Sequence, residues 1–144
     1  MRFGIFVPQG WRHDLVGIDA SEQWETMRSL AAHADAGAWE SIWVYDHFHT
    51  VPVPTEEATH EAWTLMAAFA ASTSRVRLGQ MCTCMSYRNP AYLAKVAATV
   101  DIVSGGRTEM ASAEAGTRTN GTPTGTASPA SGSASAASMR ASRS

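Results

Sequence analysis

The chain has 144 residues, enough for one domain of ordinary size. Its net charge is −2 and its pI about 6.2, so no excess of positive charge points to nucleic acid or to an anionic membrane surface as a partner. No window approaches the roughly 18 apolar residues of a membrane-spanning helix, and the N-terminus lacks the apolar core and cleavage site of a secretion signal, so we expect a cytoplasmic protein.

Apolar strands and amphipathic helices alternate over the first 110 residues. The first strand is predicted over residues 2–7, where Pro8 ends it. A helix follows from Ser21 to Gly37, and we expect this glycine to form a left-handed cap. The apolar stripe of this helix consists of Trp24, Met27, Leu30, Ala31 and Ala34.

The same alternation continues through the next two units. A second strand over residues 42–45 leads into a loop with two prolines at 50–55, which cannot be a central strand or a helix interior. A helix then runs from residue 57 or 62 to residue 71. Its predicted inner face consists of Trp63, Met66, Ala67 and Ala70. A third strand over 75–85, a third helix over 91–103 and the start of a fourth strand at 107–110 complete the series.

This order predicts an α/β fold with parallel strands joined by right-handed crossovers. Three units in this length suit either a (β/α)8 barrel or a doubly wound sheet. The first strand-to-helix turn, Pro8-Gln9-Gly10-Trp11, lacks the glycine pattern of a dinucleotide-binding domain, which argues against that class.

The two cysteines, Cys82 and Cys84, lie two positions apart on the third predicted strand. A disulfide across so short a spacing would be strained, and two cysteines alone cannot hold zinc. We therefore expect both thiols to be reduced.

The most informative stretch is the end of the second strand, where Trp43-Val44-Tyr45 turns into Asp46-His47-Phe48-His49. In α/β proteins, ligands bind outside the carboxyl ends of the strands. Asp46 and His47 are therefore candidate site residues, although a histidine at a strand end is more often a satisfied structural residue, which is the alternative for His47. The pair His47 and His49 also leaves open a metal-dependent barrel hydrolase, for which no third strong ligand appears by residue 110.

From residue 111 the composition changes to mostly Ala, Ser, Thr and Gly, without Leu, Ile, Val, Phe, Tyr, Trp or Cys. Such a segment buries too little apolar surface to offset its ordering entropy, so residues 111–144 are predicted to be a disordered tail after a domain at 1–110. The change falls inside a predicted strand. We hypothesise that the tail results from a shifted reading frame, which the DNA sequence around codon 110 would test.

Residues 1–110 resemble the luciferase-like superfamily of (β/α)8 flavin and deazaflavin enzymes, especially its coenzyme F420-dependent oxidoreductases. The similarity lies in five motifs along the chain, each at the expected position. They are Phe3-Gly4-Ile5-Phe6, Trp43-Val44-Tyr45-Asp46-His47-Phe48, Val76-Arg77-Leu78-Gly79, Tyr87-Arg88-Asn89-Pro90-Ala91-Tyr92-Leu93-Ala94-Lys95 and Asp101-Ile102-Val103-Ser104-Gly105-Gly106-Arg107.

The resemblance implies the N-terminal half of a barrel that transfers a hydride between coenzyme F420 and a small organic substrate. It implies that Asp46 hydrogen-bonds the cofactor, that His47 is a catalytic acid, base or stabiliser beside it, and that a cis peptide at Met81-Cys82, next to Thr83, backs the ring. An FMN-dependent monooxygenase is the alternative. The resemblance further implies that full-length relatives form homo-oligomers, and that four strands alone give an inactive, poorly soluble product.

Overall fold

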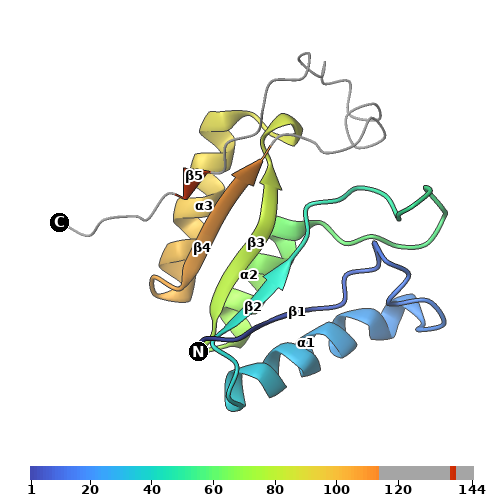
Figure 1. Cartoon of the computed structure of the whole chain (residues 1–144), viewed down its shortest axis with the longest axis horizontal. Helices are drawn as coiled ribbons and strands as arrows, with labels where there is room; N and C mark the ends of the chain where they lie inside the picture. Colours follow the sequence, from blue (N-terminus) through green and yellow to red (C-terminus); the bar gives the residue numbers. More distant parts are fainter. Residues whose placement is uncertain (114–136, 139–144) are drawn as a thin grey trace.

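The computed structural model describes residues 1–113 and 137–138, and within them four parallel strands lie side by side in sequence order. These strands are β1 (Gly4–Phe6), β2 (Ser41–Val44), β3 (Arg77–Cys84) and β4 (Thr108–Ala113). The helices that connect them are α1 (Ala20–Ala36), α2 (Ala62–Ser72) and α3 (Pro90–Ser104), with a short 3-10 helix η1 (Met85–Tyr87) before α3. The predicted alternation and the parallel sheet are confirmed (Figure 1).

Local sequence signals explain where the helices begin and end. The side chain of Asp19 accepts a hydrogen bond from the backbone N–H of Ser21, so α1 starts one residue before the predicted Ser21. Asn89 caps α3 in the same way, with Pro90 at its first position. At the other end of α3, Gly105 has φ 72°, a left-handed conformation that glycine adopts without strain.

The predicted left-handed cap at Gly37 is wrong. This glycine has φ −95° and ψ −157°, which is extended backbone. The carbonyl groups at the end of α1 are instead satisfied from outside the helix, because Arg75 donates to the carbonyl oxygens of Ala34, Gly37 and Trp39 at 2.8–2.9 Å. A long-range side chain replaces the local cap.

The core lies between the sheet and the helices, with α2 and α3 behind the strands in the view of Figure 1. Alternate residues of each strand face it, and the residues between them face the concave side of the sheet. Buried core side chains include Ile42, Val44 and Leu78 from the strands and Met27, Met66, Phe69, Leu93 and Val100 from the helices.

The predicted inner face of α2 is correct for Trp63, Met66 and Ala70, which are buried, and wrong for Ala67, which is exposed. Phe69 is fully buried instead. The helix is apolar on most of its surface, so the sequence pattern alone does not locate the buried face.

The strand β4 extends past residue 110, where the domain boundary is predicted, and that boundary stays a prediction. β4 continues to Ala113, and the two-residue strand β5 (Ala137–Ser138) pairs antiparallel with it, Ala111 opposite Ser138. The pairing of β5 with β4 uses backbone hydrogen bonds, which need no apolar side chain. The amino-acid composition therefore does not predict this pairing. The remainder of the predicted tail, 114–136 and 139–144, lies outside the described residues. In the part of the chain that is described, no helix is long and apolar enough to cross a membrane.

Asp35, near the end of α1, holds the turn that precedes β3. Partial burial acts to raise the pKa of Asp35, but hydrogen bonds from the backbone N–H groups of Val76, Ser74 and Arg75 outweigh it and lower the pKa to about 2. A lowered carboxyl pKa stabilises the fold above the unfolded-state value and loses this effect as pH falls through the folded-state value.

We therefore expect Asp35→Asn to reduce the melting temperature at neutral pH. The difference between the variant and the wild type should shrink as the pH falls from the ordinary value of 3.8 towards 2, because the wild-type carboxylate is then also neutralised. Thermal unfolding followed by circular dichroism across this range measures it. A difference that stays constant down to pH 2 would contradict the assigned role of the charge.

Candidate functional site at the carboxyl edge of the sheet

The long loop between β2 and α2 forms the centre of the candidate site. It covers residues 45–61 at the carboxyl edge of the sheet, where the loop after β1 and the segment after β3 also lie. Loops of this length inside a compact fold are more often functional than simple connections. Three of the sequence-predicted residues, Asp46, His47 and His49, belong to this loop.

Asp46 points into the protein rather than towards the concave face. Its side chain is 1% exposed and forms a bidentate ion pair with Arg88, with N–O distances of 2.6 and 2.9 Å. One carboxylate oxygen also accepts from the backbone N–H of Cys84 at 2.9 Å. Asp46 therefore joins the end of β2 to the end of β3, and its predicted direct contact with a cofactor stays a prediction.

Arg88 completes a charge network with a second acid. Its guanidinium also pairs with Glu61, whose other carboxylate oxygen accepts from the backbone N–H of Thr64 and caps α2. Burial acts to lower the pKa of Arg88, but its hydrogen bonds and charge interaction with Asp46 outweigh this and raise the pKa. The guanidinium is thus held fully charged between two carboxylates.

Gln9 organises the same loop from the side of β1. It is fully buried, and its side-chain amide donates to the carbonyl oxygens of Tyr45 and His60 at 2.6 and 2.7 Å. Its side-chain oxygen accepts from the backbone N–H of Tyr45 at 2.7 Å. The Gln9 side chain therefore supplies hydrogen bonds to backbone groups of Tyr45 and His60 that no neighbouring strand pairs.

His47 lies in a row of aromatic rings along the edge. Its imidazole stacks on Trp11, with ring centroids 4.4 Å apart and planes 9° from parallel. Trp11 contacts Tyr45, and Tyr45 stacks on Phe6 at 4.3 Å. Since Phe6 also lines the concave face, the row connects His47 to that face through ring contacts.

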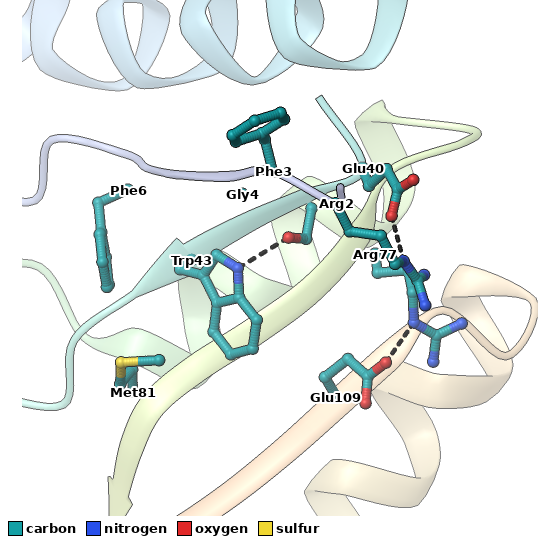
Figure 2. A pocket seen from close by; sticks show the side chains of 10 residues that line it. Arg2, Phe3, Gly4, Phe6, Glu40, Trp43, Arg77, Met81 and Glu109 are labelled. Carbon is teal, nitrogen blue, oxygen red and sulfur yellow. Dashed lines mark hydrogen bonds and ion pairs between the residues drawn. The ribbon is translucent and has the colours of Figure 1, made fainter. Parts of the chain in front are cut away.

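The concave face of the sheet contains a hollow of about 420 Å³ (Figure 2). Its lining combines a flat apolar surface with two ion pairs, Arg2 with Glu40 and Arg77 with Glu109. The lining residues are Arg2, Phe3, Gly4, Phe6, Glu40, Ser41, Trp43, Arg77, Met81 and Glu109. Met81 lies at the end of the hollow nearest the carboxyl edge, close to Phe6 in Figure 2.

Two glycines allow the Trp43 indole to lie flat on the sheet. An added Cβ at Gly79 would come within 2.4 Å of Trp43 Cζ3, and one at Gly4 within 2.5 Å of Trp43 Nε1. The indole N–H donates to the Ser41 hydroxyl at 2.8 Å. Trp43 therefore forms a fixed planar floor.

We expect Gly79→Ala to displace this floor and to destabilise the fold by about 1–3 kcal/mol, the usual cost of overpacking. Chemical unfolding, followed by tryptophan fluorescence, measures both effects. Adding Trp43→Leu to Gly79→Ala should recover most of the loss, because it removes the ring that the new methyl group meets. If Gly79→Ala has wild-type stability, the Trp43 indole is not fixed in this position and moves to accommodate the new methyl group.

The predicted segment on β3 is only partly on the concave face. The Met81-Cys82 peptide bond is cis, as predicted, and Met81 lines the hollow. Cys82 is half-buried and Thr83 fully buried, with its hydroxyl donating to Gln80. Both Cys82 and Cys84 are free thiols, as predicted. The structure thus places Met81 at a possible ligand surface and Thr83 inside the fold.

Sequence reasoning missed Gln9, Glu61 and Arg88 as parts of the site. One signal was available for Arg88, since an acid at the end of a buried strand requires a cationic or donor partner. His47 and His49 do not form a metal site, because within residues 1–113 and 137–138 no group of three or more His, Cys, Asp or Glu side chains could hold a metal ion. The hydrolase alternative has no support.

Comparison with known proteins identifies the family. The model of the luciferase-like monooxygenase family matches residues 1–126. The phthiodiolone/phenolphthiodiolone dimycocerosates ketoreductase of Mycobacterium tuberculosis is 36% identical over 96 residues, which cover 55% of this chain and 25% of that protein. The chain thus spans about a quarter of the length of this curated relative.

Solved structures agree with this assignment and give the architecture. An F420-dependent secondary alcohol dehydrogenase, solved with an F420-acetone adduct, is 25% identical, with a TM-score of 0.55 over 76% of this chain and 30% of that chain. The oxygenating constituent of 3,6-diketocamphane monooxygenase from Pseudomonas putida, solved with FMN, is 20% identical, with a TM-score of 0.61 over 76% of this chain and 28% of that chain, and shows the shared fold. The four parallel strands and their helices form the N-terminal half of a (β/α)8 barrel, and the chain belongs to the luciferase-like monooxygenase family of flavin- or F420-dependent oxidoreductases.

Proposed function

We propose that this chain supplies the N-terminal half of a site at which a hydride passes between coenzyme F420 and a small organic substrate. The observation that carries the proposal is the aromatic row that leads from His47 at the carboxyl edge to the concave hollow. An imidazole at the rim of a flat apolar surface suits a planar cofactor whose reaction needs a nearby titratable group.

The end of the hollow at the carboxyl edge fits a planar ring, whereas its other end, at Arg2, Glu40 and Arg77, lies at the start of the strands, inside the barrel that the family completes. Phe6, Trp43 and Met81 present apolar surface, and Trp43 is held flat by its two glycine neighbours. A bound deazaflavin supplies hydride transfer without ready activation of oxygen. The chain's own residues would hold it: Met81 and Cys82 would support the ring, Thr83 would fix this segment from inside the fold, and His47 would give or take the proton that accompanies the hydride.

Asp46 supports this site from within. Because its carboxylate is 1% exposed and already accepts three hydrogen bonds, a further bond to the cofactor would use a remaining lone pair of an oxygen that solvent does not reach. We therefore assign to Asp46 the fixing of the His47 loop against β3.

One ground favours coenzyme F420 over FMN. The Asp46-His47 pair after the second strand is the pattern that points to the F420-dependent enzymes within the resemblance. The second candidate is an FMN-dependent monooxygenase, which shares the same fold.

Direct titration of the chain with F420 and with FMN tests the proposal. Fluorescence of each cofactor reports binding, and we expect saturable binding with F420 preferred. His47→Ala should weaken F420 binding about tenfold, the loss of one good polar contact, whereas His33→Ala on the exposed face of α1 should not. Tighter binding of FMN would favour the monooxygenase, and the absence of binding to either would contradict the proposal.

A further inference from the structure

The loop that carries His47 is held at its base by two unrelated side chains. Gln9 and Arg88 each contact both the beginning and the end of this loop. We propose that Gln9 and Arg88 are positioning residues, two clamps that close the base of the 45–61 loop and fix the orientation of His47 at the site. This inference rests on the proposed function for the role of His47.

The first clamp lies on the β1 side. The Gln9 side chain bonds the backbone of Tyr45, at the start of the loop, and the carbonyl oxygen of His60, near its end. The backbone carbonyl of Gln9 also accepts from the N–H of His60 at 3.0 Å. A fully buried amide uses both of its donors and its acceptor on the two ends of one loop, which leaves little freedom at the base.

The second clamp lies on the β3 side. The Arg88 guanidinium pairs with Asp46 at the start of the loop and with Glu61 at its end. Its side chain is 9% exposed and that of Asp46 is 1% exposed, so the bonds between these two are shielded from water, whereas Glu61 is 40% exposed and its bond lies at the surface. The planar fork of arginine can bond two carboxylates at once, a geometry that lysine lacks.

Between the clamps, the loop is braced by its own contacts and by the β1 loop. The N–H of Val51 donates to the carbonyl oxygen of Trp11 at 2.9 Å, and Trp11 is the ring on which His47 stacks. The hydroxyl of Thr50, which is 1% exposed, accepts from the N–H of Thr55 at 2.8 Å. While Gln9 and Arg88 hold both ends of the loop, the His47 imidazole keeps one orientation. When either set of bonds is lost, the loop and the imidazole can move.

Amide hydrogen exchange on the chain without any cofactor tests the clamps directly. The probes are the hydrogen-bonded N–H groups of Val51, Thr55 and His60. In Gln9→Leu and in Arg88→Met we expect these amides to exchange at least about tenfold faster relative to those of β2 and β3. Arg28→Met, which removes an exposed arginine paired with Glu25 on α1, should leave the ratio unchanged.

Two further variants keep the test decisive. Glu61→Gln removes only the charge at the end of the loop, leaves the buried Asp46–Arg88 pair intact, and should speed exchange mainly at His60 even if Arg88→Met does not fold. Arg88→Lys should restore part of the protection at Val51 but less at His60, because an ammonium lacks the planar fork that bonds Asp46 bidentately and reaches Glu61 at the same time. Unchanged loop exchange in the folded variants, or an equal increase across α1 and α3, would overturn the proposal.

Titration of the same variants with F420 connects the clamps to the site. If His47 acts as proposed, F420 affinity should fall in the order in which loop protection falls, with Arg28→Met at the wild-type value. If the wild-type chain does not bind F420, the proposed function is wrong. The exchange data still decide in that case whether Gln9 and Arg88 hold the loop. Binding that is unaffected in variants with an open loop would show that the clamps do not position the site.

Discussion

Replacing Asp46 with alanine should destabilise the chain by about 3–5 kcal/mol, the range observed when one partner of a buried ion pair is removed. The cause is the charge that remains. Arg88 stays buried at 9% exposure with only Glu61 as a partner, and the N–H of Cys84 loses its acceptor. Urea unfolding of the wild type and of Asp46→Ala, monitored by circular dichroism, gives the difference in the free energy of unfolding.

The matched control is an acid of similar chemistry in an exposed pair. Glu25 pairs with Arg28 on the surface of α1, where solvent screens the charges, and Glu25→Ala should change the free energy of unfolding far less than Asp46→Ala. The double variant Asp46→Ala with Arg88→Met should recover much of the loss, because no uncompensated charge remains. If Asp46→Ala and Glu25→Ala cost the same, the buried pair does not hold the ends of β2 and β3 together.

Phe69→Ala should also destabilise the chain by about 3–5 kcal/mol, since it leaves a cavity in the core. The Phe69 ring is fully buried under the sheet and lies 5.7 Å from the ring of Trp24 on α1. Its removal weakens the packing of α2 against both α1 and β3. The free energy of unfolding in urea and the heat of unfolding by calorimetry both report this loss.

Phe3→Ala is the matched control, because it removes the same number of atoms from another phenylalanine. Phe3 is 55% exposed, so its truncation should cost little in the chain alone. A large effect of Phe3→Ala would mean that this ring is covered in solution. A small effect of Phe69→Ala would mean that the core around α2 rearranges to fill the space.

The sequence by itself determined the order of elements, the parallel sheet and the candidate edge. Apolar runs, caps such as Asn89-Pro90 and the glycine after α3 act within a few residues, so they can be read directly from the chain. The family motifs also predicted the position of the cis peptide at Met81-Cys82. All of these features depend on local chemistry or on patterns fixed along the chain.

The tertiary structure decided what the site residues contact. Nothing in the sequence pairs Asp46 with Arg88, 42 positions away, or brings Gln9 to both Tyr45 and His60, because side chains meet across strands only after the sheet has formed. The same reason explains three errors in the helices: Arg75 replaced the cap at Gly37, contact with α1 and the sheet selected Phe69 over Ala67, and Trp24 of the predicted stripe of α1 is 38% exposed. Periodicity is a property of one element, whereas burial and ion pairing depend on its neighbours.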